Sequence, residues 1–207
     1  MRCTDVLFAG FGGHGMLMAG KLLAQSMIKQ GRQVSWLPAY GAEMRGGTAN
    51  VTVCISDGEV MSPYIERPNS LVVMNTPSLN KFGPRVKPGG LILLNSTLIK
   101  EPFERPDCPV MSLPASRIAM DMGNAKATNL ILLGAYVGVT QITTQSEMTE
   151  VIQETFTRKP KFIPINVSAF VAGWKEGNRL RQEYGFEITA DEEDENELNS
   201  SYAYSNG

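Results

Sequence analysis

The stretch Gly10-Phe-Gly-Gly-His-Gly15 follows the apolar run Val6-Leu7-Phe8-Ala9 and precedes a segment with helical spacing that starts at Met16. This order predicts a strand that turns on glycines into a helix. The turn leaves backbone N–H groups unpaired at the helix N-terminus, where the helix dipole favours an anion. Glycines let the backbone approach that anion and adopt a positive φ. The stretch therefore predicts a phosphate-type loop at the start of an α/β fold.

Gly10, Gly12 and Gly15 have the spacing of the dinucleotide-binding fingerprint. An NAD site also places an acidic side chain for the ribose at the end of the second strand. The second predicted strand has no acid at its end, and Glu43, the nearest one, lies beyond a proline and a glycine. NAD binding is thus only half supported, and a glycine turn that merely packs a helix on a strand stays open as the alternative.

Composition narrows the class of protein. With 207 residues and 43% hydrophobic content, the chain has enough apolar residues for one domain with a substantial core. It has no apolar run long enough for a membrane span and no signal-peptide pattern at its start, so we expect a cytoplasmic protein. Three cysteines, an odd number without CxxC spacing, argue against a disulfide framework, an iron–sulfur cluster or a zinc site within this chain. With a single histidine, a Ser-His-Asp triad would have to use His14, which lies in the phosphate-type loop.

The negative charge is concentrated at the end of the chain. Residues 190–207 hold six acidic and no basic residues, which leaves 19 basic against 15 acidic residues in the remainder. We predict a folded domain over 1–189 and a disordered acidic tail over 190–207, which either stays solvated or folds on a partner. The body is too weakly basic to indicate a nucleic-acid partner.

Apolar runs alternate with helical patterns along the chain, which predicts a three-layer α/β domain with a mostly parallel sheet of about six strands and a Rossmann-like first βαβ unit. We expect the first strand to be central and the β-branched run 48–55 to be antiparallel. The predicted strands are Asp5–Ala9, Gln33–Leu37, Thr48–Ile55, Ser70–Met74, Leu91–Asn95 and Pro109–Leu113. The predicted helices are Met16–Gln30, Pro114–Met122, Ala127–Val139, Ser146–Thr157 and Asn166–Tyr184.

The helix predicted over 127–139 is apolar on all sides and has Gly134 and Gly138 four residues apart. A helix of this kind is buried. One side of this helix is expected to pack on the sheet. The sequence leaves open whether the other side packs against another helix of this chain or against another subunit.

A second glycine-rich loop reads Tyr40-Gly-Ala-Glu-Met-Arg-Gly-Gly47. Its arginine offers a planar fork suited to phosphate or carboxylate, and the flanking glycines allow close approach to the backbone. If the first two strands run parallel, both loops emerge at the same carboxyl edge of the sheet. A surface ion pair between Glu43 and Arg45 is the alternative. The residues of this loop that we assign to the site are Tyr40, Gly41, Glu43, Arg45, Gly46 and Gly47.

Together the two loops resemble those of the gamma subunit, or gamma domain, of the 2-oxoacid:ferredoxin oxidoreductases. That family usually has Gly-x-Gly-Gly-Gln-Gly in the first loop and Tyr-Gly-x-Glu-x-Arg-Gly-Gly in the second. The chain departs from this pattern at His14, where the family has Gln. Asn129, in Lys126-Ala-Thr-Asn129, matches the Asn of a third family region. The likeness covers roughly residues 5–180.

The resemblance implies a role in the CoA-dependent oxidative decarboxylation of a 2-oxoacid, such as pyruvate or 2-oxoglutarate, to acyl-CoA and CO2, with electrons passed to ferredoxin. It implies alpha, beta and ferredoxin-like delta subunits as partners, which carry thiamine diphosphate with Mg²⁺ and iron–sulfur clusters. This chain has no catalytic residue of its own in that scheme. The alternatives are a small subunit of indolepyruvate:ferredoxin oxidoreductase, a dinucleotide-binding oxidoreductase and a purely structural scaffold.

The resemblance also leaves two interpretations of the loops. Either they bind a phosphate of coenzyme A, through the N–H groups of the first loop and Arg45, or they line the thiamine site of a partner subunit. The residues assigned to coenzyme A are Gly10, Gly12, Gly13, His14, Gly15 and Arg45. Asn129 joins the second loop in the partner-facing group.

Overall fold

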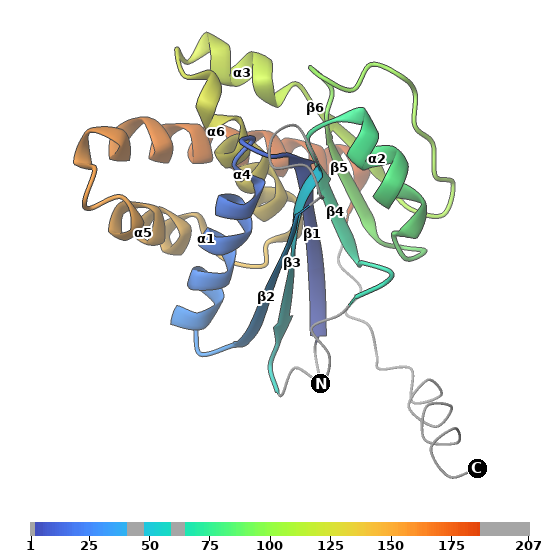
Figure 1. The fold of residues 1–207 in the computed structure, drawn as a ribbon, viewed down its shortest axis with the longest axis horizontal. Helices are drawn as coiled ribbons and strands as arrows, with labels where there is room; N and C mark the ends of the chain where they lie inside the picture. The colour runs from blue at the N-terminus through green and yellow to red at the C-terminus, as the bar shows by residue number, and fades with distance from the viewer. Residues whose placement is uncertain (1–2, 41–47, 59–64, 187–207) are drawn as a thin grey trace.

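A six-stranded sheet with helices packed against it forms the core of the computed structural model, which describes residues 3–40, 48–58 and 65–186 (Figure 1). The predicted acidic tail, 190–207, lies outside these residues. The strands are β1 (Cys3–Phe11), β2 (Gln33–Tyr40), β3 (Thr48–Ser56), β4 (Ser70–Val73), β5 (Leu91–Asn95) and β6 (Val110–Leu113). The helices are α1 (Met16–Lys29), α2 (Thr76–Phe82), α3 (Ala115–Asp121), α4 (Thr128–Thr140), α5 (Gln145–Thr155) and α6 (Ile163–Tyr184). Three short 3-10 turns are η1 (Gly83–Arg85), η2 (Ala125–Ala127) and η3 (Pro160–Phe162).

The strand order is β2-β3-β1-β4-β5-β6. β1, β4, β5 and β6 are parallel, whereas β3 runs antiparallel to both of its neighbours, β1 and β2. The predicted interior position of the first strand and the antiparallel run are confirmed. Because β3 reverses direction between them, β1 and β2 run the same way, and their carboxyl ends lie at the same edge of the sheet.

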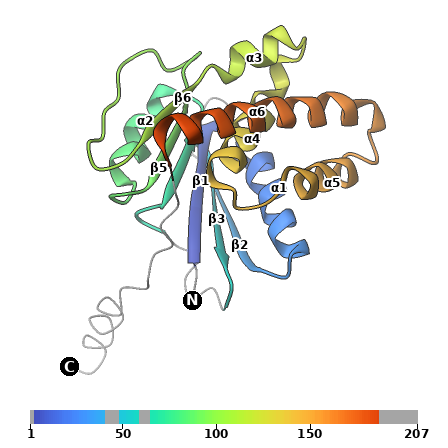
Figure 2. The same ribbon diagram turned by 180° about the vertical axis from the view of Figure 1, so that it is seen from behind.

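The two faces of β1 bury different side chains, as expected for a strand with helices on both sides. Val6 and Phe8 belong to the larger core, which includes side chains of α1, α3, α4, α5 and α6. Leu7 and Ala9 belong to a second core together with Leu79 of α2. Figure 2 shows α6 crossing in front of the sheet on the face of the larger core. The three-layer α/β prediction is therefore confirmed.

Helix α2 is the one described α-helix that the sequence patterns did not predict. It has only seven residues, too few for a helical repeat of apolar positions to stand out. Its start is specified instead by capping: the Asn75 side chain accepts the Ser78 N–H, and Pro77 occupies the first turn. At the other end of the chain, α6 begins at Ile163, three residues before the predicted start.

Glycines of α4 and of α6 each pack against the backbone of the other helix. An added Cβ at Gly134 would lie 2.8 Å from the Trp174 nitrogen, and one at Gly173 would lie 2.8 Å from the Ile131 Cα. The two helix backbones thus approach too closely for any side chain at the crossing. All thirteen residues of α4 are buried, so its apolar surface is enclosed by the sheet and by α6. The core interpretation of this helix holds.

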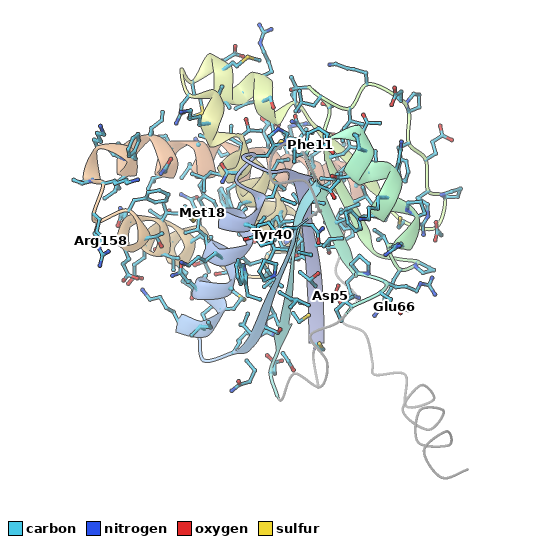
Figure 3. All side chains as sticks on the ribbon, viewed as in Figure 1. Asp5, Phe11, Met18, Tyr40, Glu66 and Arg158 are labelled. Atoms are coloured by element: carbon cyan, nitrogen blue, oxygen red, sulfur yellow. The ribbon has the colours of Figure 1, made fainter. Side chains whose placement is uncertain are left out.

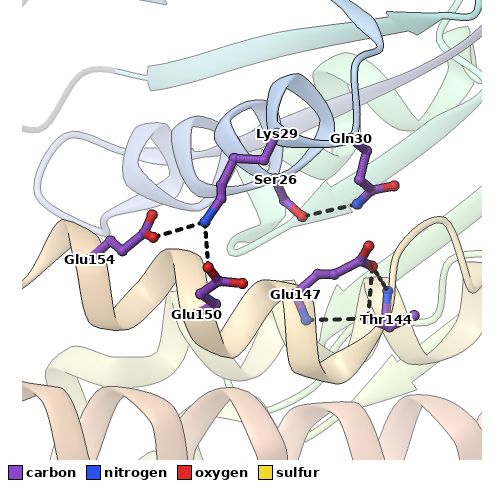
Figure 4. Close-up of polar contacts among 7 residues, drawn as sticks. All are labelled: Ser26, Lys29, Gln30, Thr144, Glu147, Glu150 and Glu154. Carbon is purple, nitrogen blue, oxygen red and sulfur yellow. Dashed lines mark hydrogen bonds and ion pairs between the residues drawn. The ribbon is translucent and has the colours of Figure 1, made fainter.

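Polar side chains hold α5 on the C-terminal half of α1 (Figure 4). Lys29 Nζ lies 2.8 Å from carboxylate oxygens of both Glu150 and Glu154. The start of α5 is a capping box, in which Thr144 Oγ1 accepts the Glu147 N–H and the Glu147 carboxylate accepts the Thr144 N–H. The ion pairs of Lys29 lie at the opposite end of α1 from the glycine loop.

Candidate functional site

The glycine loop joins β1 to α1 at the carboxyl edge of the sheet. Gly13 and Gly15 have φ angles of 93° and 74°, in the left-handed region that favours glycine. The backbone N–H of His14 donates to the Phe11 carbonyl oxygen over 3.1 Å and closes the turn. Gly12 and Gly13 are exposed, and an added Cβ at Gly13 would meet no atom within 4 Å. The loop is therefore fixed in shape, and its tip is open.

Helix α1 begins at Met16 without a side-chain cap and without an acidic residue in its first turn. The Ala19 N–H donates to the Gly15 carbonyl over 3.1 Å, which is the first hydrogen bond of the helix. The N–H groups before it have no helical partner, and the positive end of the helix dipole lies beside the glycine loop. This helix start has the features of an anion-binding site.

The His14 side chain takes part in the loop itself. Its Nδ1 accepts the Phe11 N–H over 3.3 Å, and the two rings are in contact with centroids 5.6 Å apart. Because Nδ1 is the acceptor, the neutral imidazole carries its hydrogen on Nε2. Partial burial lowers the pKa of His14 below its usual value, so the ring is neutral at pH 7. The His14 backbone N–H, expected from the sequence to face a phosphate, is already used within the loop.

Asn129 lies in the first turn of α4 and contacts the glycine loop. Its Nδ2 donates to the Gly15 carbonyl over 3.0 Å, across 114 positions of sequence. An added Cβ at Gly15 would lie 2.7 Å from that Nδ2, so a glycine is needed for this approach. The structure thus brings together two of the segments that the sequence assigned to one site. Lys126, exposed in η2 just before α4, is a cation that the sequence reasoning did not assign.

The second loop starts at the same edge. Tyr40, the last residue of β2, pairs with Ala49 of β3, which on its other side pairs with Gly10 of β1. The Tyr40 side chain is 71% exposed (Figure 3 labels it together with Phe11 of the first loop). The structure extends β2 to Tyr40, three residues beyond the predicted strand end at Leu37, so the first residue of the predicted loop is the last residue of the strand. The remaining assigned residues, Gly41, Glu43, Arg45, Gly46 and Gly47, lie outside the described residues.

The sheet has a topological switch point beside the glycine loop. The helix after β1 packs on one face and the helix after β4 on the other, although the two strands are neighbours. Ligands of open α/β sheets bind in the crevice at such a point, outside the carboxyl ends of the strands. Gly10 lies there, and an added Cβ would be 3.0 Å from the Met74 Cβ at the end of β4.

Two asparagines at the ends of neighbouring strands were missed by the sequence reasoning. Asn75 follows β4, is 5% exposed and caps α2 with Oδ1, while its Nδ2 has no hydrogen-bond partner in the described part of the chain. Asn95 ends β5 and donates to Ser116 Oγ over 2.8 Å, which joins β5 to α3. Each asparagine lies where an apolar run ends, Asn75 after Met74 and Asn95 after Leu94, and that position was the available signal.

A metal centre, a reactive thiolate and a membrane span each have little support among the described residues. Across residues 3–40, 48–58 and 65–186, no three His, Cys, Asp or Glu side chains form a group that could hold a metal ion. Burial raises the pKa of the Cys54 thiol to about 12 and also raises that of Cys108, so neither is a thiolate at neutral pH. None of the helices within these ranges is long and apolar enough to cross a membrane.

The fold and the site define an α/β protein whose open glycine loop, uncapped helix start and switch-point crevice suit an anionic ligand. The chain belongs to the pyruvate ferredoxin/flavodoxin oxidoreductase family, whose sequence model matches residues 5–176. The resemblance of the two loops is thereby confirmed at the level of the family.

Individual relatives agree with this assignment. The chain is 42% identical over 170 residues to ketoisovalerate oxidoreductase subunit VorA of Methanothermobacter thermautotrophicus, which covers 81% of this chain and 35% of that protein. It thus spans about a third of the length of that relative. It is similar to the solved gamma subunit of a keto/oxoacid ferredoxin oxidoreductase from Geobacter sulfurreducens, with 26% identity, a TM-score of 0.73 and coverage of 85% of this chain and 99% of that one. A 2-oxoglutarate:ferredoxin oxidoreductase from Magnetococcus marinus, solved with 2-oxoglutarate, coenzyme A and succinyl-CoA bound, shares the fold at 20% identity and a TM-score of 0.77, over 93% of this chain and 32% of that one.

Proposed function

We propose that this chain is the gamma subunit, or gamma domain, of a cytoplasmic 2-oxoacid:ferredoxin oxidoreductase. The complex would convert a 2-oxoacid and coenzyme A into acyl-CoA, CO2 and protons, while two electrons pass to ferredoxin. The observation that carries the proposal is an open, anion-type loop at the switch point of a chain that matches this family over residues 5–176. The similar Geobacter sulfurreducens chain, almost completely covered, is itself a gamma subunit.

In this proposal the glycine loop holds a phosphate group of coenzyme A. The donors are the N–H groups of Gly13, Gly15 and the first turn of α1, which no side chain caps. Arg45 supplies a charged fork, and the exposed Lys126 adds a cation beside Asn129. Coenzyme A is the first ligand to test because the Magnetococcus marinus enzyme, which has the same fold, was solved with it bound.

A second role for the same edge is contact with a partner subunit. Three large apolar side chains are exposed at 71%, 47% and 51%: Tyr40 at the end of β2, Leu98 after β5 and Met120 in α3. A partner subunit seated on this edge would cover these side chains. The loops would then line the thiamine site of a partner, with Glu43 and Arg45 pairing across the interface.

The redox chemistry would belong to the partner subunits. Thiamine diphosphate with Mg²⁺ in the alpha and beta subunits supplies decarboxylation, and the clusters of a ferredoxin-like delta subunit carry the electrons. This chain would bind and orient coenzyme A or close the partner's site. A substrate panel would identify the 2-oxoacid, whether ketoisovalerate, 2-oxoglutarate, pyruvate or indolepyruvate.

The experiment compares two glycines that flank α1, in the assembled complex, with CoA-dependent viologen reduction as the assay. Gly13 precedes the helix and Gly31 follows it; both have positive φ (93° and 79°), and neither has an atom within 4 Å of an added Cβ. Ala introduces the same kind of backbone strain at both positions. If the loop binds coenzyme A, Gly13→Ala raises the KM for coenzyme A about tenfold, as expected when a charged hydrogen bond is weakened. Gly31→Ala leaves it unchanged.

Equal effects of the two substitutions would reject the coenzyme A role of the loop. Arg45→Ala separates the two interpretations further: a raised KM for coenzyme A supports phosphate binding, and loss of assembly on size-exclusion chromatography supports the partner contact. If the purified chain alone oxidised a substrate with NAD, the subunit proposal itself would be wrong.

A further inference from the structure

The only histidine of the chain is built into the glycine loop as an acceptor and carries a second, unused donor. The Phe11 N–H points at Nδ1, at 3.3 Å, so that nitrogen holds the loop only while it is unprotonated. The Nε2–H of the same ring has no hydrogen-bond partner among residues 3–40, 48–58 and 65–186. The side chain thus closes the loop with one nitrogen and leaves the other for a group outside the described chain.

We propose that His14 is the positioning residue of the glycine loop, that it acts as the neutral Nε2–H tautomer, and that protonation of Nδ1 opens the loop and releases its ligand. The proton comes from solvent. It places an N–H opposite the Phe11 N–H, so two donors face each other and the hydrogen bond is lost. The loop is then competent at neutral pH and is disabled by acid.

The side chains described around the ring offer no charge that would favour the protonated form. The side chains described around the loop come from β1 (Phe11), the end of β4 (Met74), the first turn of α1 (Met16) and α4 (Asn129), and none of them titrates. The positive end of the α1 dipole further opposes a cation at this position. Partial burial acts in the same direction and lowers the pKa of His14.

The same geometry predicts which side chain can replace His14. A glutamine carries an acceptor oxygen and an N–H donor on one amide, the same pair of functions as an Nε2–H imidazole, and it does not titrate. His14→Gln should therefore keep the loop closed at all pH values. His14→Ala removes both functions. Lys21→Gln, at an exposed position of α1, is the control, because it also replaces a basic side chain by glutamine but lies outside the loop.

The structural part is tested by ¹⁵N NMR of the full chain labelled at histidine and at backbone amides. With one histidine, the ring signals need no assignment. We expect the Nε2–H tautomer, a pKa below 6.5, and a Phe11 amide shift that titrates with the ring in the wild-type chain but stays constant in His14→Gln. An Nδ1–H tautomer, a pKa above 6.5 or a Phe11 amide that ignores the titration overturns the proposal.

The ligand part rests on the proposed function and is measured in the assembled complex, as the KM for coenzyme A between pH 5 and 8. Below the pKa of His14, the wild-type KM should rise about tenfold per pH unit relative to His14→Gln. His14→Ala should raise it at every pH, and Lys21→Gln should follow the wild type. His14→Gln and wild type could show the same pH profile of the KM although the NMR titration is as expected. The loop would then not hold coenzyme A, so that part of the proposed function would be wrong, whereas the positioning role of His14 in the loop would stand.

Discussion

Replacing Gly173 by alanine tests how closely α4 and α6 must pack. An added Cβ would lie closest to the Ile131 carbonyl oxygen and 2.8 Å from the Ile131 Cα, against 3.4–4 Å in ordinary contact, so the two helices would have to move apart. The obstructing atoms belong to the backbone of α4, and no change of rotamer can move them. Overpacking of this kind costs about 3 kcal/mol when it cannot be relieved by side chains. The gain in helix propensity from Gly to Ala returns about 1 kcal/mol.

We therefore expect Gly173→Ala to lower the free energy of unfolding by about 2 kcal/mol and the Tm by about 4–8 °C for a chain of this size. The control is Ser168→Ala, at an exposed position of the same helix, which should leave the Tm unchanged or slightly raised. Both variants are compared with the parent chain by thermal denaturation followed by circular dichroism. A Tm for Gly173→Ala equal to that of Ser168→Ala would refute the claim that backbone contact at this crossing limits the fold.

Three further changes probe other contacts. Arg105→Met removes hydrogen bonds of 2.7 and 2.9 Å to two backbone carbonyls, and urea unfolding should show a loss of about 1–3 kcal/mol. Thr144→Ala removes the cap of α5 and should cost about 1 kcal/mol. Hydrogen bonds from Thr144 hold the pKa of Glu147 below its usual value of 4.5, so the wild-type chain should lose the stabilisation from this carboxylate as the pH falls below 4.5. The difference in unfolding free energy between wild type and Thr144→Ala should therefore shrink at acid pH, and a difference that stays the same would contradict this coupling. Asn129→Asp places a carboxylate against the Gly15 carbonyl and should raise the KM for coenzyme A more than Asn129→Ala does, whereas equal values would argue against an anion at the loop.

Much of the fold follows from local sequence patterns. The glycine loop and helix α1 are specified within a continuous stretch, because a strand, a turn with positive φ and an amphipathic helix each depend on neighbouring residues. β3 was likewise predicted as antiparallel from its alternating β-branched run. Helix α2 was not predicted, because seven residues carry too little periodicity and its cap depends on a single Asn75 side chain.

Only the tertiary structure decided which of these elements meet. The sequence left α4 with two possible partners, and the crossing of Gly134 with α6 placed it in the core. The same structure brought Asn129 to the Gly15 carbonyl and buried Asn75 and Asn95 near the carboxyl ends of two neighbouring strands. The sequence determined the chemistry of the glycine loop, since backbone conformation and donor groups are local properties. Strand order and helix crossing determined what surrounds that loop, because contacts between residues more than a hundred positions apart depend on packing of the whole chain.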